Sequence, residues 1–370
     1  MKVLFVIGTR PEAIKLAPVI LECQKKKGIQ ALVCSTGQHK ELLNNAFEQW
    51  SLIPDIELDV MQAGQGLNEL LSKLLSQLDI VLRDAKPDCV VVQGDTSSCL
   101  AGALASFQRK IPVYHVEAGL RTNDKSAPFP EELNRQLVSR IANVHFAPTE
   151  KNKQTLLREG ISDNDIVVTG NTVIDALMMC QKKMTPESNP EILKLQGIYE
   201  PKKKLLLVTG HRRENMGAGF LELIDALREL ASNPSLQIIY PLHLNPAVRE
   251  PMIQALGKTD GIFLIEALGY EAFVWLMSKS FLIISDSGGV QEEAPSLNKP
   301  VLVLREQTER EEAIEAGTVK LIGTLKEAIV HGVQELIEDE DAYIEMTKKP
   351  NPYGDGMAAK RIVDFLASVE

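Results

Sequence analysis

The sequence has 370 residues, of which 44% are hydrophobic and 24% charged, and its formal net charge is −10. A single hydrophobic core rarely exceeds about 250–300 residues, so we expect two domains. The composition excludes a disordered, collagen-like or coiled-coil protein, and the negative charge argues against non-specific binding to nucleic acid.

The five cysteines are scattered and form no Cys-x-x-Cys pair. We therefore expect small buried side chains in a reducing compartment, not a zinc site or a disulfide framework. An apolar strand starts at residue 2, which leaves no room for a cleavable signal sequence. No apolar run reaches the roughly 18 residues that span a bilayer. These features predict a cytoplasmic protein with no membrane partner.

Short apolar runs alternate with longer amphipathic segments in the first half of the chain. The runs predict strands buried on both faces at Val3–Ile7, Gln30–Cys34, Cys89–Gln93, Val113–Glu117 and Val144–Ala147. Helices are expected at Ala13–Lys26, Asn68–Asp84, Thr96–Gln108 and Glu131–Ala142. This alternation is typical of a parallel, doubly wound α/β sheet.

A second series of strands follows the polar, proline-containing segment Met184–Lys204. Its strands are expected at Leu205–Thr209, Gln237–Leu242, Ile262–Ile265, Phe281–Ser285, Val301–Leu304 and Val319–Ile322. Both series open with an apolar strand followed by Gly-x-Arg-x-Glu, at Gly8–Glu12 and at Gly210–Glu214. The repeated opening predicts two Rossmann-like halves.

We expect a first domain of residues 1–169 plus a C-terminal helix within 354–370, and a second domain of residues 170–353. The amphipathic segment Ala358–Val369 is expected to return to the first domain and tie the halves together. Ligands of open parallel sheets bind outside the carboxyl ends of the strands. The sequence therefore predicts an active site in a cleft between two domains.

Charged residues follow the predicted strands of the first half. Asp95 comes after a strand and a glycine, so it is either a helix N-cap or a site carboxylate. Glu117 closes a buried strand, where a carboxylate needs a partner. Glu131 and Arg135 are spaced i,i+4 at the start of a helix. They form either a surface ion pair or part of the site.

The second half has its own candidates. Ser287-Gly288-Gly289 precedes a helix and is either an N-capped turn or a phosphate cradle. Glu293, one turn further, either favours the helix dipole or binds the two hydroxyls of a ribose. His211 stands beside two arginines, in a turn that is either solvated or binds a diphosphate.

Several enzyme classes lack their motifs here. Neither half has Gly-x-Gly-x-x-Gly after its first strand, so a dehydrogenase is excluded. A P-loop, a Gly-x-Ser-x-Gly nucleophile turn and metal-ligand spacing are also missing from the sequence.

Eight strings of the sequence occur in a fixed order, within a resemblance that runs from residue 2 to about residue 366. They are Gly8–Lys15, Gly94–Thr96, His115–Thr122, Pro130–Arg135, Gly170–Asp175, Thr209–Asn215, Asp286–Pro295 and Thr308–Arg310. This set resembles the non-hydrolysing UDP-N-acetylglucosamine 2-epimerases. The resemblance implies a glycosyltransferase-B fold, with two Rossmann-like domains facing a central cleft, in a homodimer.

The resemblance also implies the reaction, which interconverts UDP-GlcNAc and UDP-ManNAc without a cofactor or metal. UDP is eliminated across C1–C2 to give enzyme-bound 2-acetamidoglucal, and it adds back with the proton on the other face of C2. Asp95, Glu117 and Glu131 are then the acid/base residues, and His211 binds the leaving UDP and is a candidate to protonate it. Which carboxylate removes the proton stays open.

The remaining site residues implied by the resemblance bind the substrate or orient the carboxylates. They are Arg10, Lys15 and Arg135 at phosphate or carboxylate, Leu268 and Phe273 at uracil, Ser287, Gly288 and Gly289 at phosphate, Glu293 at ribose and Arg310 near the diphosphate.

The sequence departs from the family pattern in two places. Glu311 replaces the usual proline beside Arg310, and we expect it to loosen that loop or weaken diphosphate binding. Residues associated with activation by a second UDP-GlcNAc are present at Gln38, His39 and His243. Glu41 and Gly64, however, differ from the groups of activated members, which leaves activation open.

Other functions remain as alternatives. A 2-epimerase of a modified sugar, of the UDP-N-acetylfucosamine or diacetamido-uronic acid type, would share these motifs. A glycosyltransferase of the same fold would share the ribose contact but would not need three carboxylates at the sugar. A hydrolysing epimerase would release free ManNAc and UDP, and a non-catalytic sensor would not need the acid/base set.

Overall fold

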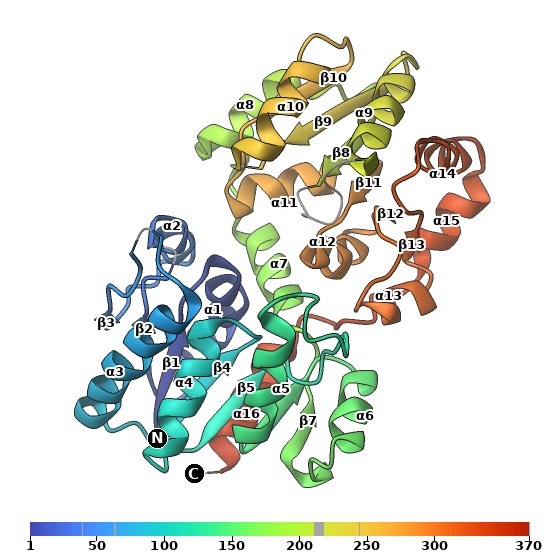
Figure 1. The fold of residues 1–370 in the computed structure, drawn as a ribbon. Helices are drawn as coiled ribbons and strands as arrows, with labels where there is room; N and C mark the ends of the chain where they lie inside the picture. Colours follow the sequence, from blue (N-terminus) through green and yellow to red (C-terminus); the bar gives the residue numbers. More distant parts are fainter. Residues whose placement is uncertain (39, 63, 211–217, 244, 370) are drawn as a thin grey trace. The chain divides into compact units, whose positions relative to one another are not determined.

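The computed structural model describes residues 1–38, 40–62, 64–210, 218–243 and 245–369. Their packing divides the chain into two compact units (Figure 1). Unit 1 contains Met1–Met179 and Tyr353–Glu370, and unit 2 contains Cys180–Pro352. No helix in the described ranges is long and apolar enough to cross a membrane.

Unit 1 is built on a seven-stranded sheet in the order β3-β2-β1-β4-β5-β6-β7, and its paired strands are parallel. The strands are β1 (Lys2–Ile7), β2 (Gln30–Ser35), β3 (Ile56–Glu57), β4 (Cys89–Gln93), β5 (Val113–Val116), β6 (Val144–Ala147) and β7 (Ile166–Val168). Every residue of β4, β5 and β6 is buried. Helices cover both faces of such strands, which is why they are continuous apolar runs in the sequence.

The helices of unit 1 are α1 (Arg10–Lys25), α2 (Lys40–Trp50), α3 (Leu67–Ala85), α4 (Ser97–Gln108), α5 (Glu131–Ile141), α6 (Glu150–Arg158), α16 (Ala358–Ser368) and α7 (Thr172–Lys183), whose last residues belong to unit 2. Gly102 lets α4 lie directly on the sheet, because a Cβ there would be 3.1 Å from Val92 and 3.3 Å from Val6. Phe365 of α16 packs edge-on against Phe146, with ring centroids 5.5 Å apart.

Residues 170–179 pack with unit 1, whereas the sequence placed them at the start of the second domain. Asp175 of α7 explains this packing. Its carboxylate accepts hydrogen bonds from the backbone N–H groups of Ala358 (3.2 Å) and Ala359 (2.9 Å), in the first turn of α16. The start of α7 and the C-terminal helix are thereby joined.

Unit 2 has a six-stranded parallel sheet in the order β10-β9-β8-β11-β12-β13. Its strands are β8 (Lys204–Thr209), β9 (Leu236–Pro241), β10 (Ile262–Ile265), β11 (Leu282–Ser285), β12 (Val301–Val303) and β13 (Val319–Leu321). Its helices are α8 (Pro190–Ile198), α9 (Ala218–Ala231), α10 (Pro246–Leu256), α11 (Tyr270–Lys279), α12 (Gly288–Glu293), α13 (Glu311–Glu315), α14 (Lys326–Glu338) and α15 (Glu340–Lys348). The prediction of two parallel α/β sheets is confirmed.

The strand order reverses at the first strand of each unit. β1 lies between β2 and β4, and β8 lies between β9 and β11. In open parallel sheets, ligands bind beyond the carboxyl ends of the strands at this reversal. A ligand site is therefore expected at the turns that follow β1, β4 and β11.

Candidate active site

The turns after β1 and β4 are joined by the buried carboxylate of Glu12. Thr9 is the N-cap of α1, and Glu12 at N3 accepts the backbone N–H groups of Gly8 (3.0 Å) and Thr9 (2.7 Å). The Thr96 hydroxyl donates to the other carboxylate oxygen at 2.8 Å, and burial raises the pKa of Glu12 to about 7. Glu12 is absent from the predicted site residues, although Thr-x-x-Glu spacing is the signal of a capping box. Arg10, which is predicted, follows this turn as the first residue of α1.

Glu117 follows β5 and is held by donors from two other elements. Lys15 of α1 places Nζ 2.5 Å from Oε2, and Gln93 of β4 places Nε2 2.6 Å from the same oxygen. The Glu117 side chain is 9% exposed. Its φ of 65° lies in the left-handed region, which few residues other than glycine adopt. The carboxylate thus has the cationic partner that its burial requires.

Asp95 pairs with α5 and does not cap α4. The N-cap of α4 is Thr96, whose hydroxyl accepts the backbone N–H of Cys99 at 3.0 Å, so the capping interpretation of Asp95 is wrong. The Asp95 carboxylate forms an ion pair with Arg135, and its side chain is 25% exposed. Its backbone carbonyl accepts the side-chain amide of Asn134 at 2.9 Å. A salt bridge and a hydrogen bond therefore fix this turn against α5.

The first turn of α5 presents two carboxylates in different surroundings. Glu132 is fully buried, lies 3.4 Å from Arg135 and accepts the backbone N–H of Thr122 at 3.0 Å. Glu131 is half-buried, and its carboxylate has no hydrogen-bond or ion-pair partner in the described part of the chain. The i,i+4 ion pair of Glu131 with Arg135 is accordingly not formed there. Arg135 pairs with Asp95 instead.

Two neutral histidines lie in the sheet below these turns. His115 of β5 is fully buried, and its Nε2 lies 2.8 Å from the carbonyl oxygen of Gly94. Burial lowers the pKa of His115 to about 3, so its ring is neutral and donates this hydrogen bond. His145 is its register partner on β6, and burial lowers the pKa of His145 to about 4. The uncharged ring of His115 therefore supports the Gly94–Asp95 turn.

In unit 2, the turn after β11 begins α12. Ser287 is the N-cap, but its side chain makes no capping hydrogen bond. Gly288 packs closely against the guanidinium of Arg310. A Cβ at this position would be only 2.4 Å from Cζ, so a larger residue would collide with it. Gly289 has more room, and the nearest atom to its Cβ position is 3.7 Å away, in Glu293. Close approach of Arg310 therefore requires glycine at 288 only.

Arg310 is oriented by two buried carboxylates. Its Nε and Nη2 lie 3.0 and 2.9 Å from Oε1 of Glu292, and its Nη1 donates to Glu309. Arg305 reaches the other oxygen of Glu309 at 2.9 Å. A planar guanidinium engaged through all three nitrogens has one fixed orientation. The network thus holds Arg310 beside Gly288.

The remaining predicted contacts of unit 2 lie on α11 and α12. Glu293 is buried, and the Tyr270 hydroxyl donates to it at 2.5 Å. Phe273 is half-buried on α11, and Leu268 is half-buried just before that helix. Tyr270 is not among the residues predicted from the sequence. The only signal that could have identified it is an aromatic residue at the start of a helix.

Some predicted residues lie outside the described ranges, namely His211 with its neighbours Arg212 and Arg213, His39, and the side chain of Glu41. Gln38 is described and accepts the Ser98 hydroxyl at 2.8 Å. The Nδ1 of His243 accepts the backbone N–H of Asn245 at 3.1 Å.

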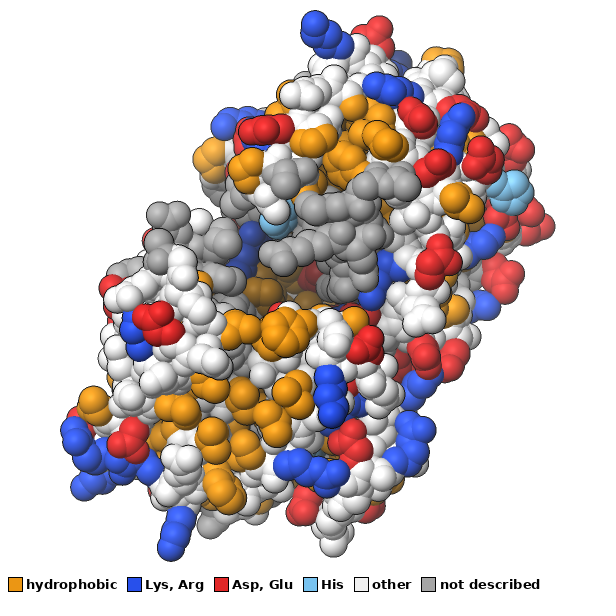
Figure 2. All heavy atoms as spheres, viewed as in Figure 1, with side chains coloured by type: hydrophobic (Ala, Val, Ile, Leu, Met, Phe, Trp, Pro, Cys, Tyr) orange, Lys and Arg blue, Asp and Glu red, His pale blue; other side chains and the backbone are white. Residues whose placement is uncertain are grey.

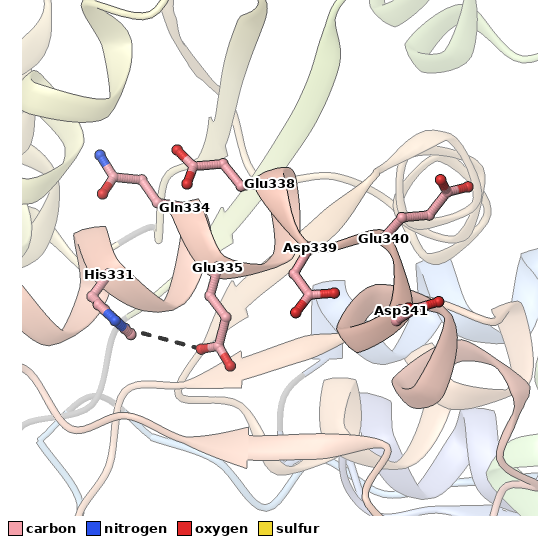
Figure 3. Close-up of a pocket in the computed structure, with 7 residues that line it drawn as sticks. All are labelled: His331, Gln334, Glu335, Glu338, Asp339, Glu340 and Asp341. Carbon is pink, nitrogen blue, oxygen red and sulfur yellow. Dashed lines mark ion pairs between the residues drawn. The ribbon is translucent and has the colours of Figure 1, made fainter.

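A separate acidic pocket of about 580 Å³ opens on α14 and α15 (Figure 3). It is lined by His331, Gln334, Glu335, Glu338, Asp339, Glu340 and Asp341, and contains none of the predicted site residues. Among the described residues, no three or more His, Cys, Asp or Glu side chains are placed so that they could hold a metal ion together. The negative charge of this acidic pocket would repel a diphosphate, so we do not place the active site in it.

Known proteins resemble this chain over its whole length. Residues 21–367 match the family model of UDP-N-acetylglucosamine 2-epimerase. The UDP-N-acetylglucosamine 2-epimerase of Escherichia coli (strain K12) is 50% identical over 369 residues, with 99% of this chain and 98% of that protein covered. The corresponding Campylobacter jejuni protein is 47% identical over 371 residues, with 99% and 97% covered.

Solved structures agree with the sequence comparison. The UDP-GlcNAc 2-epimerase from Neisseria meningitidis bound to UDP-GlcNAc has a TM-score of 0.93 and 48% identity, with both chains fully covered. The Methanocaldococcus jannaschii enzyme in complex with UDP-GlcNAc and UDP has a TM-score of 0.84 and 36% identity, also with full coverage. The predicted glycosyltransferase-B fold is confirmed, and the chain belongs to the UDP-N-acetylglucosamine 2-epimerase family.

Proposed function

We propose that this epimerase interconverts UDP-GlcNAc and UDP-ManNAc by inverting C2 of the sugar. The observation that supports this most is a pair of carboxylates after adjacent strands, Asp95 beside Arg135 and Glu117 beside Lys15. Relatives whose structures contain UDP-GlcNAc or UDP support the choice of a UDP-sugar.

The C2 proton is not acidic, so direct removal would be slow. We propose elimination instead: the C2–H electron pair forms the C1–C2 double bond, and the C1–O bond breaks toward the UDP oxygen. A carboxylate takes the proton. UDP then adds back through the same oxygen at C1, while a proton is delivered to the opposite face of C2. This route needs two proton carriers and a stabilised diphosphate.

Unit 1 supplies the proton carriers in this proposal. Asp95 is paired with Arg135, and Glu117 is paired with Lys15, so both carboxylates are held in place by a cationic side chain. Glu131 has no partner among the described residues, which leaves its carboxylate able to exchange a proton with a ligand. Each of the three is a candidate for the base that removes the C2 proton.

Unit 2 supplies the residues that bind UDP in this proposal. We assign the diphosphate to the Ser287–Gly289 turn and to Arg310, whose fixed guanidinium would stabilise the charge that develops on the leaving group. Glu293, oriented by Tyr270, is assigned to the ribose hydroxyls. Leu268 and Phe273 are assigned to uracil, and His211 to the leaving diphosphate, on the family resemblance. Arg10 is assigned to phosphate in the same way.

Proton NMR of UDP-GlcNAc with the enzyme in heavy water tests the reaction. We expect UDP-ManNAc to form with deuterium at C2, without any acceptor and without free ManNAc. Asp95→Asn, Glu117→Gln and Glu131→Gln should each lower kcat by about 100-fold or more, whereas Asp79→Asn, which removes only an exposed ion pair with Arg109, should not. Near-normal rates in all three variants would refute the assigned roles. Parallel assays with UDP-N-acetylfucosamine test the sugar preference.

We further propose that the enzyme is a homodimer that uses the α3–α5 face of unit 1. Ile80, Phe107, Leu133 and Leu137 leave 40–61% of their surface exposed on these neighbouring helices. Figure 2 shows hydrophobic side chains gathered over this part of unit 1. Phe107→Glu with Leu137→Glu should convert a dimer to a monomer in sedimentation. Leu221→Glu, at an exposed leucine of unit 2, is the control, and an unchanged dimer in the double variant would exclude this face.

We also place the enzyme in the cytoplasm. All five cysteines are buried and none of them forms a disulfide in the described part of the chain, which is the state expected in a reducing compartment. Alkylation of the denatured protein taken directly from cells should modify every cysteine, and protected thiols would contradict this location.

A further inference from the structure

Gln93 is a buried polar residue at the carboxyl end of β4, next to the predicted catalytic carboxylate. Its surface is 4% exposed, and it stands in register with Val116 of β5. The backbone N–H of Gly94 donates to the Val116 carbonyl at 3.0 Å. The sheet therefore fixes the position of Gln93 relative to Glu117, the residue that follows Val116.

The side-chain amide of Gln93 donates to Oε2 of Glu117 at 2.6 Å, and Lys15 donates to the same oxygen at 2.5 Å. The other oxygen, Oε1, has no donor in the described part of the chain. Two donors from different directions hold one oxygen and leave the other open to a ligand. The backbone of Glu117 has a left-handed conformation, which few residues other than glycine adopt. This conformation sets the direction in which the side chain leaves the backbone.

The two donors differ in what they contribute. Lys15 provides charge on a long flexible side chain, whereas Gln93 provides a neutral hydrogen bond from a strand. A proton-transfer group must be held within about 0.5 Å of its productive position, and a strand residue is better suited to this than a lysine. We propose that Gln93 is a positioning residue, which holds Oε2 of Glu117 so that Oε1 exchanges the proton at C2. This inference rests on the proposed function.

Two substitutions of Gln93 should affect the pH profile in opposite directions. Gln93→Met keeps the side-chain length and removes the donor. We expect kcat to fall about 10- to 100-fold with a nearly unchanged KM, and the acid limb of the kcat profile to move to higher pH, because the ionised carboxylate loses a hydrogen bond. Activity of this variant relative to wild type therefore falls as the pH is lowered.

Gln93→Glu has nearly the same shape, but it donates only when the new carboxyl group is protonated. At high pH the two carboxylates repel each other. As the pH falls, one shared proton restores a donor to Glu117, so activity relative to wild type should rise. A residue that only fills space would not produce this inversion.

Gln237→Met is the matched control. Gln237 is also a fully buried strand glutamine, and its amide donates to the Ile198 carbonyl at 2.5 Å in unit 2. We expect this variant to lower Tm and leave the pH profile of kcat unchanged. A Gln93→Met profile that coincides with that of wild type, or a Gln93→Glu ratio that does not rise at low pH, would overturn the proposal.

A thermal double-mutant cycle separates this inference from the proposed function, because it needs no substrate. Gln93→Met, Glu117→Leu and the double variant are melted at neutral pH, since neither replacement side chain can form the hydrogen bond. If the two side chains interact, the double variant loses less Tm than the sum of the single losses, whereas additive losses overturn the positioning role. A wild-type protein that does not exchange C2 of UDP-GlcNAc would refute the proposed reaction, and the cycle would still decide the contact.

Discussion

Thr96 donates its hydroxyl to Glu12 at 2.8 Å, and this hydrogen bond joins the turn after β1 to the turn after β4. Arg10 follows the first of these turns as the first residue of α1, and Asp95 precedes Thr96 in the second. The two turns belong to neighbouring strands of one sheet. A single buried carboxylate therefore sets the spacing of two predicted site residues.

Removing this carboxylate should destabilise unit 1. Glu12→Ala leaves the N–H groups of Gly8 and Thr9 and the Thr96 hydroxyl without their acceptor, which should cost about 3 kcal/mol or more in unfolding free energy. Glu12→Gln should cost much less, because its amide oxygen accepts the two N–H groups and its NH₂ donates to Thr96. Urea titration measures both, and equal losses would show that these bonds do not matter.

The difference in unfolding free energy between wild type and Glu12→Gln should change with pH. Burial raises the pKa of Glu12 from 4.5 to about 7 in the folded state. A raised pKa means that this group's contribution to stability is fully present below about pH 4.5 and is lost as the pH rises through about 7. Glu12→Gln has no such titration. Its unfolding free energy should improve relative to wild type between pH 5 and 8.5, and a constant difference would contradict the raised pKa.

His145 should show the opposite dependence. Burial lowers its pKa from 6.5 to about 4, so its contribution is present above about pH 6.5 and is lost as the pH falls through about 4. We expect His145→Gln to gain stability relative to wild type as the pH falls through this window. Thermal melts of the two proteins at matched ionic strength measure the effect.

The sequence predicts the long elements and the turns because they depend on local patterns. β4 and β5 are short, mostly apolar and fully buried, and Asp95 follows β4, which lies beside β1 at the reversal of strand order. β3, with two residues, is too short for any pattern to appear, and β7, with three, lies at the edge of the sheet and is only partly buried. Helix α8 lies within the segment that the sequence marks only as polar and proline-containing.

The contacts within the site could not be predicted in the same way. Glu12 and Thr96 are 84 residues apart, and Lys15 and Glu117 are 102 apart. Only the folded sheet brings such residues together, so a single sequence gives the candidates without their partners. This is why Arg135 is expected beside Glu131, its neighbour on α5, but pairs with Asp95.

Glu311 can be judged from its place in α13. It is an exposed first residue of the helix, a position that favours proline, and Arg310 before it is anchored by Glu292 and Glu309. We expect Glu311→Pro to leave the Kd for UDP within about twofold and to stabilise the protein by up to about 1 kcal/mol. Calorimetry with UDP measures the affinity. A much tighter complex would show that the glutamate weakens diphosphate binding.

Adjacent glycines at the start of α12 allow the phosphate cradle to be tested apart from the packing of Arg310. Gly288→Ala should lower both Tm and UDP affinity, because its methyl group meets the guanidinium of Arg310 at 2.4 Å. Gly289→Ala meets no protein atom closer than 3.7 Å, so Tm should hold or rise slightly, since alanine favours a helix. If phosphate approaches the backbone there, UDP affinity should still fall about tenfold.

Gly197→Ala on α8, where the space is open, should change neither affinity nor packing. A Gly289→Ala variant that binds UDP as wild type does would leave the turn as a plain helix start, because the methyl group occupies the space that a phosphate oxygen needs.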